Sequence, residues 1–226
     1  MNTLQIPQFP GMLRKNDGLF LFGALQPKPF VSVYRQSAIE VVHGPSCRRP
    51  VDEIYLDRCD NDGIPVIERR GGGGTVVLAP GMVVTIVVGQ RIVTHPATTY
   101  FKRIHDVMIG ILERIGIRGI EKSGISDLSL HDRKILGSSL YMGTNPPFFY
   151  YQSSLLVAPD LSLFEKYLRY PPREPDYRRK RSHGSFCTSL CEEGYTVTAD
   201  AIYHLFSKQL TPLLLIEEEK VPPGSE

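Results

Sequence analysis

The chain has 226 residues and a formal net charge of +2 at pH 7, and 42% of its residues are hydrophobic and 22% charged. This composition is typical of a globular domain and excludes a disordered chain, while the small net charge argues against nucleic acid or a membrane as the main partner. The longest apolar runs, such as residues 82–88, are far shorter than the roughly 20 residues of a membrane span, and the N-terminus lacks a signal-peptide pattern. We therefore expect a cytoplasmic protein.

The predicted elements in the first part of the chain are mostly short strands. We expect an extended lead-in or edge strand over residues 1–30, strands over 30–42 and 64–67, a short helix over 49–59, and two strands over 75–78 and 82–88 joined by a tight turn at Ala79-Pro80-Gly81.

The second part of the chain begins with the clearest helix, over residues 97–115, whose apolar positions form one stripe that stops at Gly116. We then expect strands over 119–122, 127–130, 134–142 and 148–157, a short helix over 161–168 capped by Asp160, a basic, proline-containing loop over 171–185, and a last helix over 198–210 capped by Thr198. Strands clustered around a few helices, without regular βαβ alternation, predict a single α+β domain with mixed or antiparallel sheets over residues 1–216. Residues 217–226 are predicted to be a disordered acidic tail.

The cysteines indicate neither a metal site nor a disulfide framework. Cys47, Cys59, Cys187 and Cys191 form no Cys-x-x-Cys pair, and no histidine lies at zinc-finger spacing from them. We expect reduced, unpaired thiols and no structural zinc.

The most informative stretch is the glycine run RRGGGGTVVLAPG, residues 69–81. Four consecutive glycines cost backbone entropy, so such a run usually occurs where the backbone must approach a ligand closely, and the arginines before it suit an anion. The run matches neither the Walker motif nor the dinucleotide-binding fingerprint. The alternative is a flexible connector between strands.

This glycine run resembles the signature of the lipoate–protein ligase family, part of the biotin/lipoate ligase–octanoyltransferase superfamily. The resemblance implies that the loop wraps the lipoyl chain and the phosphate of an acyl-adenylate. Leu78 and Met82 stand where many members carry a His and an Asn. Contacts made through the backbone survive these differences, whereas a side-chain role of that His is lost.

A second stretch, SDLSLHDRKILGSS at residues 126–139, resembles the lysine motif of the same family. Formation and use of an acyl-adenylate both build negative charge on phosphate and carbonyl oxygens, and a fixed ammonium group stabilises that charge. The resemblance implies that Lys134 is this catalytic group and that Asp127 lies near the nucleotide or its magnesium ion. It also implies that Gly137 permits close approach, and that Ser138 or Ser139 donates to the acyl-adenylate.

Two further stretches resemble the family more weakly. In YYQSSLLVAPD, Ser153 fits the pattern and Tyr151 replaces a His, but an ordinary core strand explains the stretch equally well. The basic run Arg178–Arg181 stands where family members have a loop before the last helix. This run either closes over the adenylate or meets an acidic carrier domain, unless it is simply a solvated loop.

The site implied by the resemblance has three parts. Lys134 is the catalytic residue. The lipoate or acyl-adenylate site comprises Arg69, Arg70, Gly72, Gly73, Gly74, Thr75, Gly137, Ser138, Ser139 and Ser153. The ATP site comprises Val76, Val77, Gly81, Met82, Asp127 and Lys134, with a Mg²⁺ ion near Asp127.

The implied function is an ATP-dependent lipoate–protein ligase, which converts lipoate to lipoyl-AMP and transfers the lipoyl group to a lysine of a carrier domain. The alternatives are an octanoyl or lipoyl transferase that forms a thioester on Cys187, and a non-catalytic relative. No cysteine lies between Gly72 and Ser185, but Cys187 follows the basic run and lies near His183. The sequence leaves open lipoate against octanoate and the identity of the carrier. We expect a catalytic domain without a C-terminal accessory domain, which a separate chain could supply.

Overall fold

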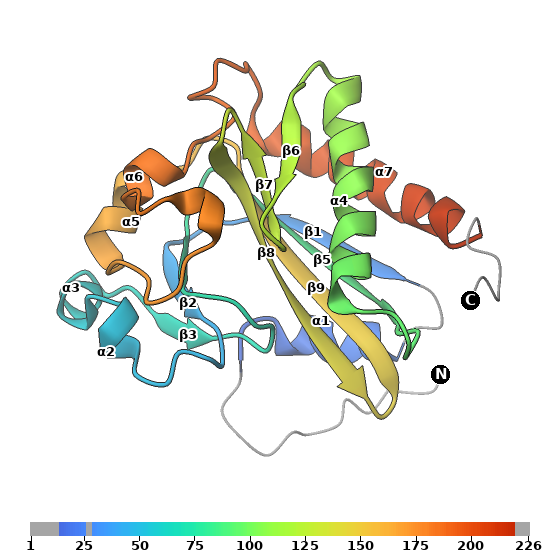
Figure 1. The fold of residues 1–226 in the computed structure, drawn as a ribbon, viewed down its shortest axis with the longest axis horizontal. Helices are drawn as coiled ribbons and strands as arrows, with labels where there is room; N and C mark the ends of the chain where they lie inside the picture. The colour runs from blue at the N-terminus through green and yellow to red at the C-terminus, as the bar shows by residue number, and fades with distance from the viewer. Residues whose placement is uncertain (1–13, 26–28, 220–226) are drawn as a thin grey trace.

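The computed structural model describes residues 14–25 and 29–219, and its centre is a six-stranded sheet in which every neighbouring pair of strands is antiparallel (Figure 1). The order of its strands is β1 (Phe30–Arg35), β5 (Met82–Gln90), β9 (Pro147–Leu156), β8 (Arg133–Thr144), β7 (Asp127–Leu130) and β6 (Ile120–Ser123). A smaller sheet has the order β3 (Val66–Glu68), β2 (Glu40–His43) and β4 (Val76–Leu78), with β2 parallel to β3 and antiparallel to β4. This confirms the predicted single α+β domain.

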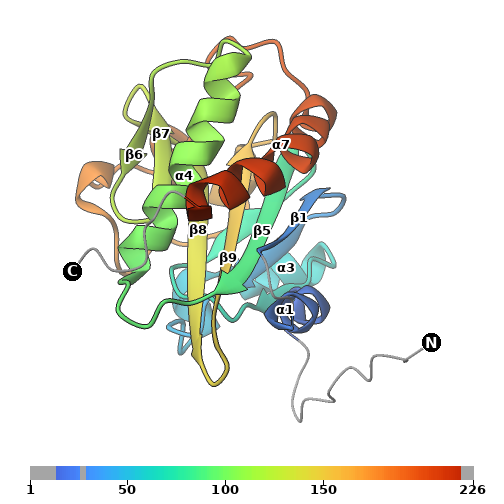
Figure 2. The same cartoon turned by 90° about the vertical axis from the view of Figure 1, so that its right-hand side faces the viewer.

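The two faces of the large sheet are covered by different helices, because alternate side chains of a strand point to opposite faces. Helices α4 (Ala97–Arg114) and α7 (Ala199–Glu219) cover one face, where Val83 and Val87 of β5 join the main core (Figure 2). Ile86 and Val88, at the alternate positions, face α1 (Asp17–Ala24) on the other side.

A second apolar cluster joins the small sheet to the end of the large one. Val41 and Val77 contribute from the small sheet, and Met82 and Leu156 from the large one. The cluster is completed by the short helices around it, which are α3 (Leu56–Asn61), α5 (Ser162–Tyr167) and α6 (His183–Phe186). Helix α2 (Pro50–Glu53) and the 3₁₀ helix η1 (Asp176–Arg178) lie in the connecting segments. A cavity opens between these two sheets.

Most predicted elements are confirmed with shifted ends, but the predicted strand over residues 30–42 is wrong. It forms two strands in different sheets, β1 and β2, with Gln36 between them donating from its side chain to the carbonyl of Ala38 at 2.7 Å. The predicted helix over residues 49–59 is also interrupted, because Ile54 is extended and pairs with Leu168. A continuous apolar pattern does not reveal where a chain leaves one sheet for another.

The two ends of the described chain also differ from the prediction. Residues 17–24 form a helix rather than an extended lead-in, because Phe20 packs edge-on against Tyr141 and Phe148. Helix α7 continues to Glu219, so residues 217–219 are helical; residues 220–226, together with 1–13 and 26–28, lie outside the described residues. Thr198 caps α7 as predicted, accepting from the amide of Ala201 at 3.1 Å. Within residues 14–25 and 29–219, no helix is both long enough and apolar enough to span a membrane.

Candidate functional site

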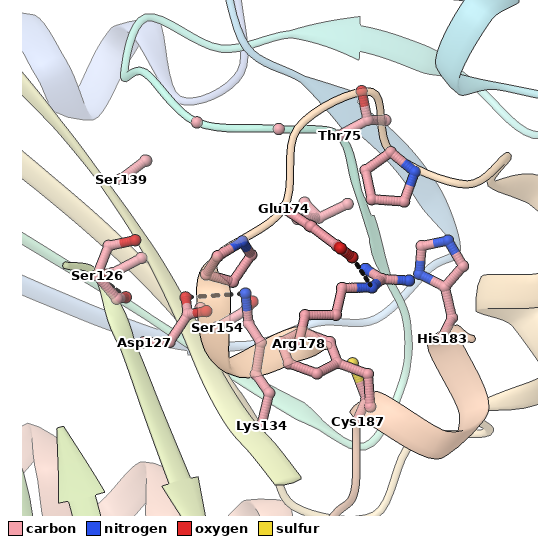
Figure 3. Close-up of a pocket in the computed structure, with 18 of the residues that line it drawn as sticks. Thr75, Ser126, Asp127, Lys134, Ser139, Ser154, Glu174, Arg178, His183 and Cys187 are labelled. Carbon is pink, nitrogen blue, oxygen red and sulfur yellow. Dashed lines mark hydrogen bonds and ion pairs between the residues drawn. The ribbon is translucent and has the colours of Figure 1, made fainter. Parts of the chain in front are cut away.

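A cavity of about 870 Å³ lies between β4 of the small sheet, strands β7 to β9 of the large sheet, and residues 171–185, which we call the strap. Figure 3 shows its side chains, with Lys134 and Asp127 on the sheet side and Glu174, Arg178 and His183 on the strap side. The strap contains η1 and the first turn of α6, where the sequence predicted only a loop. The cavity thus brings together both strong sequence motifs and Arg178 of the basic run.

Arg69 holds the glycine loop from behind. Its side chain is buried and donates to the carbonyl oxygens of Val42, Gly72 and Gly74 at 3.3, 2.9 and 2.8 Å. Burial lowers the pKa of its guanidinium group to about 10, which still leaves it charged at neutral pH. Because these carbonyls turn toward Arg69, the loop can present other backbone groups to a ligand: within the described residues the amides of Gly73 and Gly74 form no hydrogen bond.

Lys134 and Asp127 form an ion pair inside the cavity. The Lys134 Nζ lies 2.9 Å from Asp127 Oδ1, and Asp127 Oδ2 accepts from the hydroxyl of Tyr177 at 2.8 Å. The Lys134 side chain crosses over Gly137, where an added Cβ would lie 2.8 Å from the Nζ atom. Gly137 therefore leaves the space through which the ammonium group reaches the cavity.

The serines of β8 and β9 line the cavity from the sheet. Ser138, Ser139 and Ser153 all lie along it, and the Oγ of Ser153 is buried without a partner in the described part of the chain. Ser138 Oγ donates to the carbonyl of Ser126 at 2.6 Å and lies 3.3 Å from His105 Nε2 of helix α4. Burial lowers the pKa of His105 to about 4, so its ring is neutral at pH 7. Nothing in the sequence pattern around His105 indicated that it supports Ser138.

Cys187 and His183 line the strap side of the cavity, as the alternative of a transferase with a thioester on Cys187 requires. Burial raises the pKa of the Cys187 thiol to about 11, which keeps it protonated at neutral pH. Burial also lowers the pKa of His183, whose Nε2 lies 3.1 Å from the carbonyl oxygen of Arg169. A neutral buried thiol is a poor nucleophile, because the thiolate is the reactive form.

Several predicted site residues do not line the cavity: Arg70, Gly72, Gly81 and Met82. Arg70 instead forms an ion pair with Asp17, with 2.6 Å between Arg70 Nε and Asp17 Oδ1. Met82 is fully buried in the second apolar cluster. Gly81 has a φ of 90°, and an added Cβ would meet the carbonyl of Ala158 at 2.4 Å, so the turn itself requires glycine there. Tyr151, which replaces the family's His, is also buried, and its hydroxyl oxygen lies 3.1 Å from His105 Nε2. The remaining predicted residues, from Arg69 to Ser153, do line it.

Asp127, near which the sequence places a magnesium ion, has two partners in the structure. One carboxylate oxygen of Asp127 faces Lys134, and the other accepts from the hydroxyl of Tyr177. Among the described residues, no group of three or more His, Cys, Asp or Glu side chains could hold a metal ion. Mg²⁺ usually binds through one or two carboxylates together with the phosphates of a substrate. Asp127 is therefore a partner of Lys134 in this structure.

Comparison with known proteins gives consistent matches. The family model described as the lipoyl protein ligase A/B catalytic domain matches residues 27–211. A lipoate–protein ligase of Streptococcus pyogenes serotype M5 (strain Manfredo) is 26% identical over 161 residues, which cover 70% of this chain and 46% of that protein. The chain therefore spans about half the length of this curated relative.

Solved structures of low sequence identity share the fold. A bi-partite lipoate protein ligase from Thermoplasma acidophilum, described with its E2 lipoyl domain, has a TM-score of 0.66 at 20% identity and covers 85% of this chain and 80% of its own. P. falciparum LipL1 in complex with lipoate has a TM-score of 0.66 at 18% identity, covering 87% of this chain and 53% of its own. Lipoate-protein ligase A bound with ATP has a TM-score of 0.64 at 20% identity, and the match covers 85% of this chain and 82% of that structure's chain.

Proposed function

Because this chain belongs to the lipoyl protein ligase A/B catalytic domain family, we propose that it is the catalytic domain of an ATP-dependent lipoate–protein ligase. The observation that carries the proposal is the ammonium group of Lys134, placed over Gly137 in the same cavity as the glycine loop. A fixed cation and free backbone amides in one cavity suit a reaction that builds charge on phosphate and carbonyl oxygens.

The proposed reaction has two steps. The carboxylate of lipoate attacks the α-phosphorus of ATP, the bond to the β-phosphate breaks, and pyrophosphate leaves with the displaced electron pair. The neutral amine of a carrier lysine then attacks the carbonyl carbon of lipoyl-AMP, AMP leaves, and the amine loses a proton to give the lipoamide. Lys134 stabilises the negative charge that develops on the oxygens in both steps.

The proposed substrates rest on the ligands of structural relatives. One relative is in complex with lipoate and another is bound with ATP, which supports these two molecules as ligands of this cavity. The bi-partite archaeal ligase and its lipoyl domain support a lipoyl carrier domain as acceptor and an accessory domain on a separate chain. We propose that Mg²⁺ enters with the phosphates of ATP. The cytoplasmic location and the choice between lipoate and octanoate stay predictions.

A transferase that uses Cys187 is the second candidate, because Cys187 lines the same cavity as Lys134. The raised pKa of its thiol argues against it. The family description covers both the A and the B type, so it does not choose between the two mechanisms.

The two mechanisms are distinguished by pyrophosphate release from ATP and Mg²⁺ in the presence of lipoate, with no carrier protein added. We expect release from the unmodified chain and from Cys187→Ser, with Cys191→Ser, an exposed cysteine, as the matched control. If no pyrophosphate is released, while octanoyl transfer between carrier proteins proceeds and fails only in Cys187→Ser, the transferase is correct. Failure of both reactions together with loss of ATP and lipoate binding would indicate a non-catalytic relative.

A further inference from the structure

Arg178 has a buried cationic nitrogen that no described residue satisfies. It ends η1 within the strap, and its side chain is only 6% exposed. Its Nε donates to the carbonyl of Arg181 at 3.0 Å and lies 3.6 Å from Glu174 Oε2. Its Nη2 is buried and has no hydrogen-bond partner within residues 14–25 and 29–219. Leaving a charged donor buried and unpaired is costly, so such an atom points to a ligand.

The plane of the Arg178 guanidinium group is fixed by its neighbours. Its central carbon lies 4.8 Å from the ring centroid of Phe186 and 5.0 Å from that of Tyr170. Aromatic rings at this distance attract the cation and limit its rotation. An arginine that is held in this way binds an anion with little further loss of side-chain freedom, and its planar fork matches phosphate oxygens.

Arg178 is also one of the residues that line the cavity. Arg178 is the only member of the basic run Arg178–Arg181 among the cavity-lining residues, and Figure 3 shows it on the strap side, between Lys134 and His183 in this view. Arg179, by contrast, is 72% exposed and lies 3.5 Å from Asp132. The two arginines are adjacent in sequence, yet only Arg178 can reach a ligand in the cavity.

We propose that Arg178 binds a phosphate oxygen of the nucleotide through its Nη2 atom. The proposal rests on the proposed function, because it requires ATP in this cavity. Gly73 and Gly74, whose amides form no hydrogen bond within the described residues, line the same cavity from the loop, Lys134 lines it from the sheet, and Arg178 supplies a cation from the strap. A phosphate group, with several oxygens around one phosphorus, can accept from donors on three different elements at once.

The test measures dissociation constants by calorimetry for ATP, adenosine and lipoate, each added alone to the full chain. We expect Arg178→Met to weaken ATP binding by about 10- to 100-fold, which corresponds to the loss of one charged hydrogen bond. Binding of adenosine and lipoate should stay within about twofold, because neither carries a phosphate. Arg179→Met removes the same charge outside the cavity and should leave all three constants within about twofold.

The outcomes separate this inference from the proposed function. Equal ATP binding by Arg178→Met and the unmodified chain would overturn the role of Arg178 alone. Parallel loss of ATP and adenosine would indicate a structural role, and selective loss of lipoate would assign Arg178 to a carboxylate; either result overturns the proposal. If the unmodified chain binds no ATP, the proposed function fails and this inference fails with it.

Arg178→Lys keeps the test decisive if Arg178→Met does not fold. Lysine retains the charge but loses the planar fork and the fixed second donor, so we expect ATP binding to weaken by about 3- to 10-fold with adenosine unchanged. Circular dichroism and thermal unfolding verify that each variant is folded. Unchanged ATP binding by a folded Arg178→Lys protein would contradict a contact through Nη2.

Discussion

The β7–β8 hairpin and the strap enclose the cavity from opposite sides, and different interactions hold them in place. The hairpin is part of the six-stranded sheet, so the backbone hydrogen bonds of β6, β8 and β9 position Lys134 and Asp127. The strap contributes no strand to either sheet. It reaches the hairpin through side chains, with Tyr177 donating to Asp127 and Arg181 to the carbonyl of Asp132 at 2.8 and 2.9 Å.

This difference predicts separate roles for the hairpin and the strap in the proposed reaction. A sheet holds a side chain in one position at all times, which suits the group that must stabilise a transition state. A segment attached by a few side-chain contacts opens at a lower free-energy cost, which suits the entry and release of a nucleotide. We therefore expect substitutions of the cavity-lining hairpin residues to reduce the chemical step, and substitutions of the strap residues that line the cavity to weaken nucleotide binding.

The largest effect is expected for Lys134→Ala. Removing the cation from the cavity should lower lipoate-dependent pyrophosphate release by about 1,000-fold or more, because the charge on the phosphate oxygens is no longer stabilised. Thermal unfolding should remain close to that of the unmodified chain. Lys102→Ala, which removes an exposed lysine from helix α4, is the matched control and should retain full activity. An active Lys134→Ala protein would show that the hairpin does not provide the catalytic cation.

The next effect concerns Gly137→Ala, which adds one methyl group beneath the same lysine. The new Cβ would lie 2.8 Å from both Cε and Nζ of Lys134, so the flexible end of that side chain must move away from Asp127. We expect pyrophosphate release to fall by about 100-fold with little change in stability, because a misplacement of about 1 Å has effects of this size. Gly184→Ala, where an added Cβ meets nothing within 4 Å, serves as the control. Equal activity of the two variants would show that the position of Lys134 over Gly137 is not required.

A pH effect tests the support behind the hairpin. In the unfolded chain His105 takes up a proton near its usual pKa of 6.5, whereas burial lowers the pKa in the folded protein to about 4. Between these values the unfolded state binds more protons, so the free energy of unfolding falls as the pH is lowered from 6.5 to 4. His105 alone should account for about 2 kcal/mol between pH 7 and pH 5.

Urea unfolding at the two pH values measures this effect. His105→Gln should reduce the difference between pH 7 and pH 5, and His204→Gln, whose side chain is 70% exposed, should not. The same pH dependence in the unmodified chain and in His105→Gln would mean that His105 is not buried as a neutral ring behind Ser138.

The smallest effect is expected for Tyr177→Phe, which removes the direct hydrogen bond between the strap and Asp127. Burial is the main reason why the pKa of Tyr177 is raised, so its hydroxyl stays protonated and donates throughout the neutral range. The phenyl ring can still pack against Phe186, which limits the damage. We expect ATP binding to weaken by about 3- to 10-fold, less than for the loss of a direct contact, because this hydrogen bond holds the strap and does not reach ATP itself.

Tyr195→Phe is the control for Tyr177→Phe, because its hydroxyl lies 3.2 Å from the carbonyl of Arg118 in an exposed position. If Tyr177→Phe binds ATP as well as Tyr195→Phe does, the contact with Asp127 does not hold the strap. A fall in the rate of pyrophosphate release at saturating ATP would show that Tyr177 supports the chemical step, as the hairpin residues do, and not nucleotide binding.

The sequence alone determined the α+β class, the helix over residues 97–115, the strands β5 to β9 of the large sheet, and the two motifs that hold Gly73, Gly74, Asp127 and Lys134. These features are local: a hydrophobic period, a glycine run or a short hairpin expresses its preference within a dozen residues. Lys134 and Asp127 belong to one hairpin, but the sequence assigned Asp127 to the nucleotide or its magnesium ion, and only the structure paired it with Lys134.

Only the tertiary structure decided which residues meet from distant parts of the chain. It separated β1 from β2 into two sheets, placed His105 behind Ser138, joined Tyr177 to Asp127, and buried Arg178 in the cavity while leaving Arg179 exposed. The physical reason is that burial and partner choice depend on what packs against a residue, and for these residues the partners lie tens of residues away. The local sequence pattern determines whether a segment forms a helix, a strand or a turn, whereas the packing of distant elements determines which of its side chains are buried and which partners they bind.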